Sequence, residues 1–114
     1  MEISERSSGN VTLVDLNGKL MLGEPTQRLH DKVNSLIQQG RKNIVLNLAD
    51  VSAIDSGGLG ELVRTLTTMQ KHGGSLKVAN LPKRVYDLLV MTRLVTVFET
   101  FEDEGAAVKS FAGS

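Results

Sequence analysis

Residues 55–60 of the sequence are Asp55-Ser56-Gly57-Gly58-Leu59-Gly60. The apolar run before them predicts a buried strand over residues 43–48. Apolar residues after them recur at helical spacing and predict a helix: Leu59, Leu62, Val63, Leu66 and Met69. Ser56 therefore lies at or next to the N-cap, where unpaired N–H groups and the positive end of the helix dipole stabilise anions such as phosphate. We expect Ser56, flanked by glycines, to be a site of reversible phosphorylation.

The rest of the sequence predicts two opening strands and then helices and strands in alternation. The expected strands cover residues 3–6, 11–16, 43–48, 76–79 and 95–98. The expected helices begin at Pro25, near Ser56, at Pro82 and at about Asp103, and the first two end at Gly40 and at Gly73-Gly74. This pattern predicts the α/β class, with about four to five strands in a mixed sheet and about four helices packed on it.

Turns and loops complete this expected topology. Ser8-Gly9-Asn10 signals one turn, and Asn17-Gly18 is expected to close the second strand in a turn that makes the first strand pair antiparallel. Residues 51–60 are expected to form a loop at the carboxyl end of a parallel strand, where α/β sheets place their functional sites. We expect residues 1–114 to form a single domain.

Composition excludes several classes of function. The chain has 114 residues, is 40% hydrophobic and contains no cysteine, so it can build one core but has no disulfide or thiolate metal site. Its net charge is +0 and its aromatic content is 4%, which disfavours direct binding to nucleic acid. No apolar run reaches membrane-spanning length, and the segment after Met1 lacks the apolar core of a signal peptide. We expect a cytoplasmic protein without membrane insertion.

The stretch at Ser56 has a purely structural interpretation as well as a functional one. Asp and Ser are preferred N-cap residues, so helix capping alone accounts for both of them. The glycines do not fit that interpretation, because Gly57, Gly58 and Gly60 each weaken a helix by about 1 kcal/mol relative to alanine. One reason for such glycines is the close approach of another backbone or of a partner to this surface.

Enzymatic interpretations of the same stretch are weaker. A nucleophilic serine needs a base, and His30 and His72 lie on predicted helices, where we expect them at the surface. Gly58-Leu59-Gly60 lacks the third glycine of a dinucleotide-binding motif, and the Lys-Ser/Thr of a P-loop is also missing. We therefore expect no catalytic residue, no metal site and no cofactor, and a binding module rather than an enzyme.

With these residues identified, the sequence resembles the STAS domain, as found in bacterial anti-sigma-factor antagonists, over nearly its whole length. The residues that carry the resemblance are Ile44-Val45-Leu46-Asn47-Leu48, Val51, Ile54, Asp55-Ser56-Gly57-Gly58-Leu59-Gly60, Gly73-Gly74-Ser75-Leu76-Lys77-Val78, Val85-Tyr86-Asp87-Leu88-Leu89 and Leu94-Val95-Thr96-Val97-Phe98. The Asp-Ser-x-Gly-Leu-Gly string is specific in this order and context.

The resemblance implies a partner-switching mechanism. An unmodified antagonist binds an anti-sigma factor, usually a serine kinase with a histidine-kinase-like ATP fold, and thereby frees a sigma factor. The kinase phosphorylates the serine after the loop aspartate, which is Ser56 here, and a metal-dependent serine phosphatase restores it. ATP and Mg²⁺ belong to the kinase. The family also includes domains with other roles, so this chain could instead serve as a soluble subunit of a membrane lipid-transport system or of a stress-sensing scaffold.

The resemblance also implies a set of partner-binding residues. They comprise the whole motif Asp55-Ser56-Gly57-Gly58-Leu59-Gly60, together with Met21 and Glu24. Many family members carry an acidic residue soon after a Gly-x-Leu segment in the second strand. Here Gly18-Lys19-Leu20 is followed by Met21, and the acidic residue Glu24 comes slightly later.

Overall fold

The computed structural model describes residues 1–112 and confirms the mixed α/β fold in this part of the chain. The elements are β1 (Glu2–Ser8), β2 (Val11–Leu20), α1 (Glu24–Gln38), β3 (Asn43–Ile54), α2 (Ser56–Lys71), β4 (Ser75–Ala79), α3 (Lys83–Met91), β5 (Glu99–Phe101) and α4 (Glu104–Ala112). The strands form one sheet in the order β1-β2-β3-β4-β5. β1 is antiparallel to β2, and each later neighbour pair is parallel.

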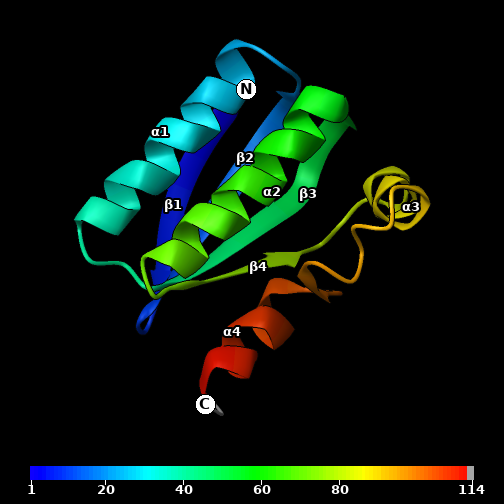
Figure 1. Cartoon of the computed structure of the whole chain (residues 1–114). Helices are drawn as coiled ribbons and strands as arrows, with labels where there is room; N and C mark the ends of the chain where they lie inside the picture. The colour runs from blue at the N-terminus through cyan, green and yellow to red at the C-terminus, as the bar shows by residue number, and fades with distance from the viewer. Residues whose placement is uncertain (113–114) are drawn as a thin grey trace.

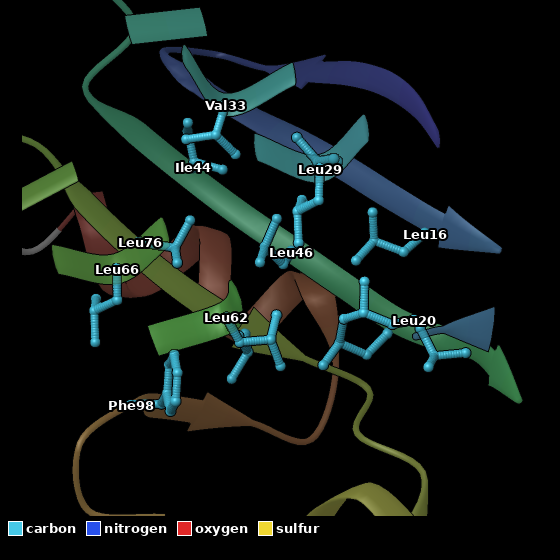
Figure 2. Close-up of a cluster of buried hydrophobic side chains, with 14 of the residues drawn as sticks. Leu16, Leu20, Leu29, Val33, Ile44, Leu46, Leu62, Leu66, Leu76 and Phe98 are labelled. Carbon is cyan, nitrogen blue, oxygen red and sulfur yellow. The ribbon is translucent and has the colours of Figure 1, made fainter. Parts of the chain in front are cut away.

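The main core lies between one face of the sheet and the helices α1 to α3. α1 and α2 lie side by side over the strands, and α4 lies apart from them (Figure 1). Because side chains alternate along a strand, Ile44 and Leu46 of β3 point into this core and are fully buried. Figure 2 shows part of it: Leu16, Leu20, Leu29, Val33, Ile44, Leu46, Leu62, Leu66, Leu76 and Phe98.

A smaller core on the opposite face of the sheet holds α4. Val45 of β3 and Ala107 of α4 are fully buried in it, and Val108 and Phe111 are partly buried. The buried Lys77 side chain of β4 reaches the same layer, where its Nζ donates to the Ser110 hydroxyl at 2.6 Å and lies 4.1 Å from the centre of the Phe111 ring. The last helix, expected to begin at about Asp103, therefore packs on the sheet through Ala107, Val108 and Phe111.

The predicted turn at Asn17-Gly18 is wrong, although the antiparallel pairing of the first two strands is confirmed. Both residues lie inside β2, which continues to Leu20 with register shifts against β3 on either side of them. The antiparallel pair instead turns at Gly9-Asn10, where Gly9 has φ +60°. Gly18 has φ +121° within the strand, a conformation that glycine adopts without strain.

The predicted strand over residues 95–98 is also wrong. The N–H groups of Leu94 and Val95 both donate to the Leu89 carbonyl, at 2.8 and 3.1 Å, so this backbone closes the end of α3. Phe98 is buried in the main core, and the last strand, β5, begins one residue later. Leu94, Val95 and Phe98 therefore contact the core without forming a ladder of strand hydrogen bonds, whereas Thr96 and Val97 are exposed.

β3 is longer than predicted, and its extra length sets the position of the site. Residues 51–54, expected in a loop, continue the strand and pair with Gly18–Leu20 of β2. α2 begins two residues after β3 ends, with Asp55 between them. Within residues 1–112, none of the helices combines the length and the apolar character that crossing a membrane requires.

Two leucines test where the main core ends. Leu46 is fully buried, whereas 76% of Leu22 is exposed in the loop between β2 and α1. Leu46→Ala should lower the free energy of unfolding by about 2–5 kcal/mol, because it removes packed methyl groups and leaves a cavity. Leu22→Ala should change it by less than about 0.5 kcal/mol. Urea denaturation measures both, and equal losses would contradict this assignment of the core.

Candidate functional site

A single carboxylate fixes the start of α2. Asp55 is the N-cap residue, and its Oδ1 accepts a hydrogen bond from the Gly58 N–H at 2.7 Å. Both carboxylate oxygens also accept from the Leu22 N–H, at 3.1 Å each. The Asp55 N–H donates to the Leu20 carbonyl at 3.4 Å. Asp55 therefore connects the start of α2 to the loop between β2 and α1, and we call this set of hydrogen bonds the Asp55 bridge.

The Asp55 bridge has an electrostatic consequence. Hydrogen bonds from the N–H groups of Gly58 and then Leu22 lower the pKa of the Asp55 carboxyl below its ordinary value, because they stabilise the ionised form. A negative charge thus stands at the amino end of α2 at neutral pH, where the helix dipole favours it.

Ser56 is the first residue of α2, and its side chain is exposed. It follows the N-cap residue directly, so of the two positions expected for it, at the cap or next to the cap, Ser56 occupies the second. Exposure at the amino end of a helix leaves the hydroxyl accessible to a modifying enzyme and leaves room for a phosphate in solvent.

The three glycines of the motif differ in whether the surrounding structure leaves room for a side chain. A Cβ on Gly58 would lie 1.9 Å from the Leu20 carbonyl oxygen, and a Cβ on Gly57 would lie 2.5 Å from the Leu22 Cβ. Gly58 is therefore required by the approach of the end of β2, and Gly57 by the approach of the loop that follows it. Gly60 is exposed, and a Cβ there would meet nothing within 4 Å. The fold of this chain gives no reason for that glycine.

The other residues expected to bind a partner divide into exposed and buried ones. Met21 and Glu24 are exposed, with Glu24 in the first turn of α1 beside Arg28. Gly58 and Leu59 are buried, so they shape the turn from inside. The sequence analysis missed Leu22, although an apolar residue between a strand end and Pro25 is an available signal.

A groove between α1 and α2 lies beside Ser56. It measures about 460 Å³ and is lined by Leu22, Gly23, Thr26, Gln27, Gly57, Gly60, Glu61 and Arg64. Gly60 forms part of its wall and leaves it open. The Glu61 side chain is buried there and accepts from the Thr65 hydroxyl at 3.3 Å, while its Oε2 lies 3.5 Å from His30 Nδ1.

Neither histidine is hydrogen-bonded to Ser56. His30 lies on α1, where it contacts Asn34 of the same helix and Glu61 of α2. His72 Nδ1 lies 2.9 Å from the Thr68 carbonyl at the end of α2. In the part of the chain that the structure describes, no three His, Cys, Asp or Glu side chains cluster so that they could hold a metal ion. The site combines an exposed hydroxyl, a fixed negative charge and an open groove.

Two alanine substitutions separate the roles of the glycines. Gly58→Ala should lower the free energy of unfolding by about 1–3 kcal/mol or more, because the new methyl group overlaps the Leu20 carbonyl oxygen. Gly60→Ala should raise it by about 0.5–1 kcal/mol, because alanine favours the helix and meets no neighbour. Chemical denaturation measures both, and a loss of stability in Gly60→Ala would contradict the open environment described for it.

Stability should depend on pH through Asp55. Its pKa in the folded protein lies below the value in the unfolded chain, about 3.9, so the ionised carboxylate stabilises the fold above that pH. The stabilisation is lost as pH falls through the folded-state pKa. The melting temperature of Asp55→Ala should therefore lie furthest below that of the wild type at neutral pH, and the gap should shrink below about pH 4. A gap that stays constant from pH 7 to pH 3 would contradict the bridge.

Comparison with known proteins places this chain in a family. The family model described as the STAS domain matches residues 2–107. The anti-sigma-B factor antagonist of Bacillus subtilis (strain 168) is 39% identical over 71 residues, a match that spans 62% of this chain and 64% of that protein. The matched part is thus less than two thirds of the length of this curated relative.

Solved structures show the same fold. A Thermotoga maritima protein proposed to be an anti-sigma factor antagonist has a TM-score of 0.87 and 23% identity, covering 95% of this chain and 92% of its own. The Bacillus cell fate determinant SpoIIAA in its phosphorylated form has a TM-score of 0.74 and 17% identity, and the match covers 96% of this chain and 99% of that one. Sequence identities this low establish only the fold. The family match over residues 2–107 goes further, and this chain belongs to the STAS domain family.

Proposed function

We propose that this protein is an anti-sigma-factor antagonist that is switched by phosphorylation at Ser56. Unmodified, it binds an anti-sigma factor that is also a serine kinase, so that a sigma factor is released. The observation that carries the proposal is the exposed Ser56 hydroxyl on the first residue of α2, held beside an ionised Asp55 and next to an open groove. The similarity to the Bacillus subtilis antagonist supports the same role.

The chemical step uses groups supplied by the partners. The kinase transfers the γ-phosphoryl group of ATP to the Ser56 oxygen, the hydroxyl proton is released and ADP leaves. A serine phosphatase then adds water across the phosphate ester, which restores the hydroxyl and releases inorganic phosphate. This chain supplies only the acceptor and its surroundings, and ATP and metal ions bind to the enzymes that act on it.

The fold should tolerate the phosphate where a bound partner does not. Phosphorylation adds about −1.5 to −2 charges at pH 7, and the amino end of α2 favours negative charge there. Because Ser56 is exposed, the phosphate stays in water without displacing any packed side chain. In the complex the same group would lose water beside the carboxylate of Asp55, and an uncompensated charge in an interface is costly. Modification therefore blocks binding and leaves the fold intact.

The groove beside Ser56 supplies the rest of the proposed contact. Leu22 gives an apolar anchor that is exposed in the free protein, and Met21 lies next to it in the same loop. Gly60 leaves the wall of the groove without a side chain, which allows a backbone of the partner to approach closely. The helix-weakening glycine at position 60 thus has a reason in the complex that it lacks in the free chain.

Binding and phosphorylation assays test this function. Each anti-sigma kinase encoded in the source genome is purified and titrated with wild type, Ser56→Ala and Ser56-phosphorylated protein. We expect one kinase to bind the wild type and Ser56→Ala equally, and to place phosphate on Ser56 alone. Phosphorylation should weaken binding at least about 30-fold, because an unpaired charge buried in an interface costs about 2–5 kcal/mol. Phosphate on another residue, or equal affinity of the folded phosphorylated form, would contradict the proposal.

Gly60→Ala provides a readout that a purely structural role would not give. The substitution should stabilise the free protein yet weaken kinase binding, since the methyl group projects into the groove. Thr67→Ala is the matched control, because Thr67 is exposed on α2 seven residues further along and does not line the groove. Equal affinity of Gly60→Ala and Thr67→Ala would remove the groove from the interface.

A further inference from the structure

A second hollow lies on the other side of the Asp55–Ser56 turn, between the end of β3 and α3. It measures about 630 Å³ and is lined by Ile54, Lys83, Arg84, Asp87, Leu88 and Met91. We call it the α3 hollow. Ile54, which lines the hollow, is the residue directly before Asp55, the N-cap of α2. Its lining is mostly apolar, and Met91 is 80% exposed, more than any other large apolar side chain of the described residues.

The different lengths of two neighbouring strands create this hollow. β4 ends at Ala79, opposite Asn47, whereas β3 continues to Ile54. The last part of β3 therefore has no strand beside it on that side, and the chain leaves β4 to form α3 there (Figure 1). A hydrogen bond connects α3 to this part of β3, from Arg84 Nη1 to the Ser52 carbonyl at 3.3 Å.

The charges at the rim of the α3 hollow are not balanced within the chain. Lys83 is paired with Asp87 at 2.8 Å, but Arg84 has no carboxylate partner among the described residues and bonds only to a carbonyl group. Both cations stand in the first turn of α3, which contains no acidic residue and where the helix dipole disfavours positive charge. An exposed arginine beside an apolar hollow is complementary to an apolar side chain that has a carboxylate near it.

We propose that the α3 hollow is the second half of the interface with the anti-sigma kinase. It receives an apolar side chain of the kinase, and a carboxylate next to that side chain pairs with Arg84. The proposal rests on the proposed function and adds to it the place and chemistry of a second contact. With Leu22 on one side and Met91 on the other, Ser56 lies inside the interface rather than at its rim. That position explains why phosphorylation would act on the whole contact, since central, fully desolvated positions dominate binding.

Two neighbouring residues of α3 give a matched test. Met91 lines the hollow, whereas Val90 is 47% exposed on the same turn and does not line it. Met91→Asp and Val90→Asp place the same charge at the same end of the same helix. The experiment titrates each variant and the wild type, all unphosphorylated, against the kinase that binds the wild type. Circular dichroism and melting curves confirm that each variant is folded.

We expect Met91→Asp to weaken kinase binding at least tenfold and Val90→Asp to change it less than twofold. Met91→Ser, which adds no charge, should give an intermediate loss of kinase affinity. It replaces Met91→Asp in the test if that variant does not fold. Arg84→Glu should weaken binding as well, and raising the salt concentration should reduce the difference between Arg84→Glu and the wild type.

The possible failures are distinguishable. If no kinase binds the wild type, the proposed function and this inference both fall. If a kinase binds the wild type and both Met91 variants equally well, the α3 hollow lies outside the interface while the proposed function stands. If Met91→Asp leaves kinase affinity unchanged but abolishes self-association of the free protein in light scattering, the occupant is a second copy of this chain and the inference is wrong.

Discussion

The position of Ser56 depends on the ionised carboxylate of Asp55. This side chain caps α2 through Gly58 and accepts the Leu22 N–H, so it joins two segments that lie 33 residues apart in the sequence. The short distances that result leave no room for side chains at positions 57 and 58. Capping, the approach of the two segments and the exposure of Ser56 are therefore consequences of one set of hydrogen bonds. A bridge of this kind keeps an accessible hydroxyl in one place without burying it.

The same geometry separates what the fold requires from what binding requires. Gly58 is needed because the Leu20 carbonyl occupies the place of its side chain, whereas Gly60 faces open space. Leu22 and Met91 are large, apolar and mostly exposed, and the folded chain gains little from either. Leu22 and Gly60 line the groove beside Ser56, and Met91 lines the α3 hollow together with Ile54. This distribution is what a surface shaped for a partner predicts, and it is independent of the family comparison.

Sequence patterns predicted the sheet, the helices and the place of Ser56, because regular apolar spacing and capping residues are local signals. They failed where long-range contacts decide the structure. Val95, Thr96 and Val97 favour a strand, but the Leu89 carbonyl takes the N–H groups of Leu94 and Val95 and prevents one. The hydrogen bonds between the Leu22 N–H and the Asp55 carboxylate could not be predicted from local spacing, because the two residues lie 33 positions apart. Nor could the α3 hollow, which exists because β4 is shorter than β3.

Amide hydrogen exchange of Leu22, followed by NMR, tests the Asp55 bridge most directly. Leu22 is exposed in a loop, so its N–H should exchange as fast as in an unfolded chain unless a hydrogen bond protects it. We expect the Leu22 and Gly58 amides to be protected from exchange in the wild type. In Asp55→Ala the protection should be lost at Leu22, while Leu46 in the main core stays protected. Unprotected exchange at Leu22 in the folded wild type would show that the Asp55 carboxylate does not hold the loop between β2 and α1.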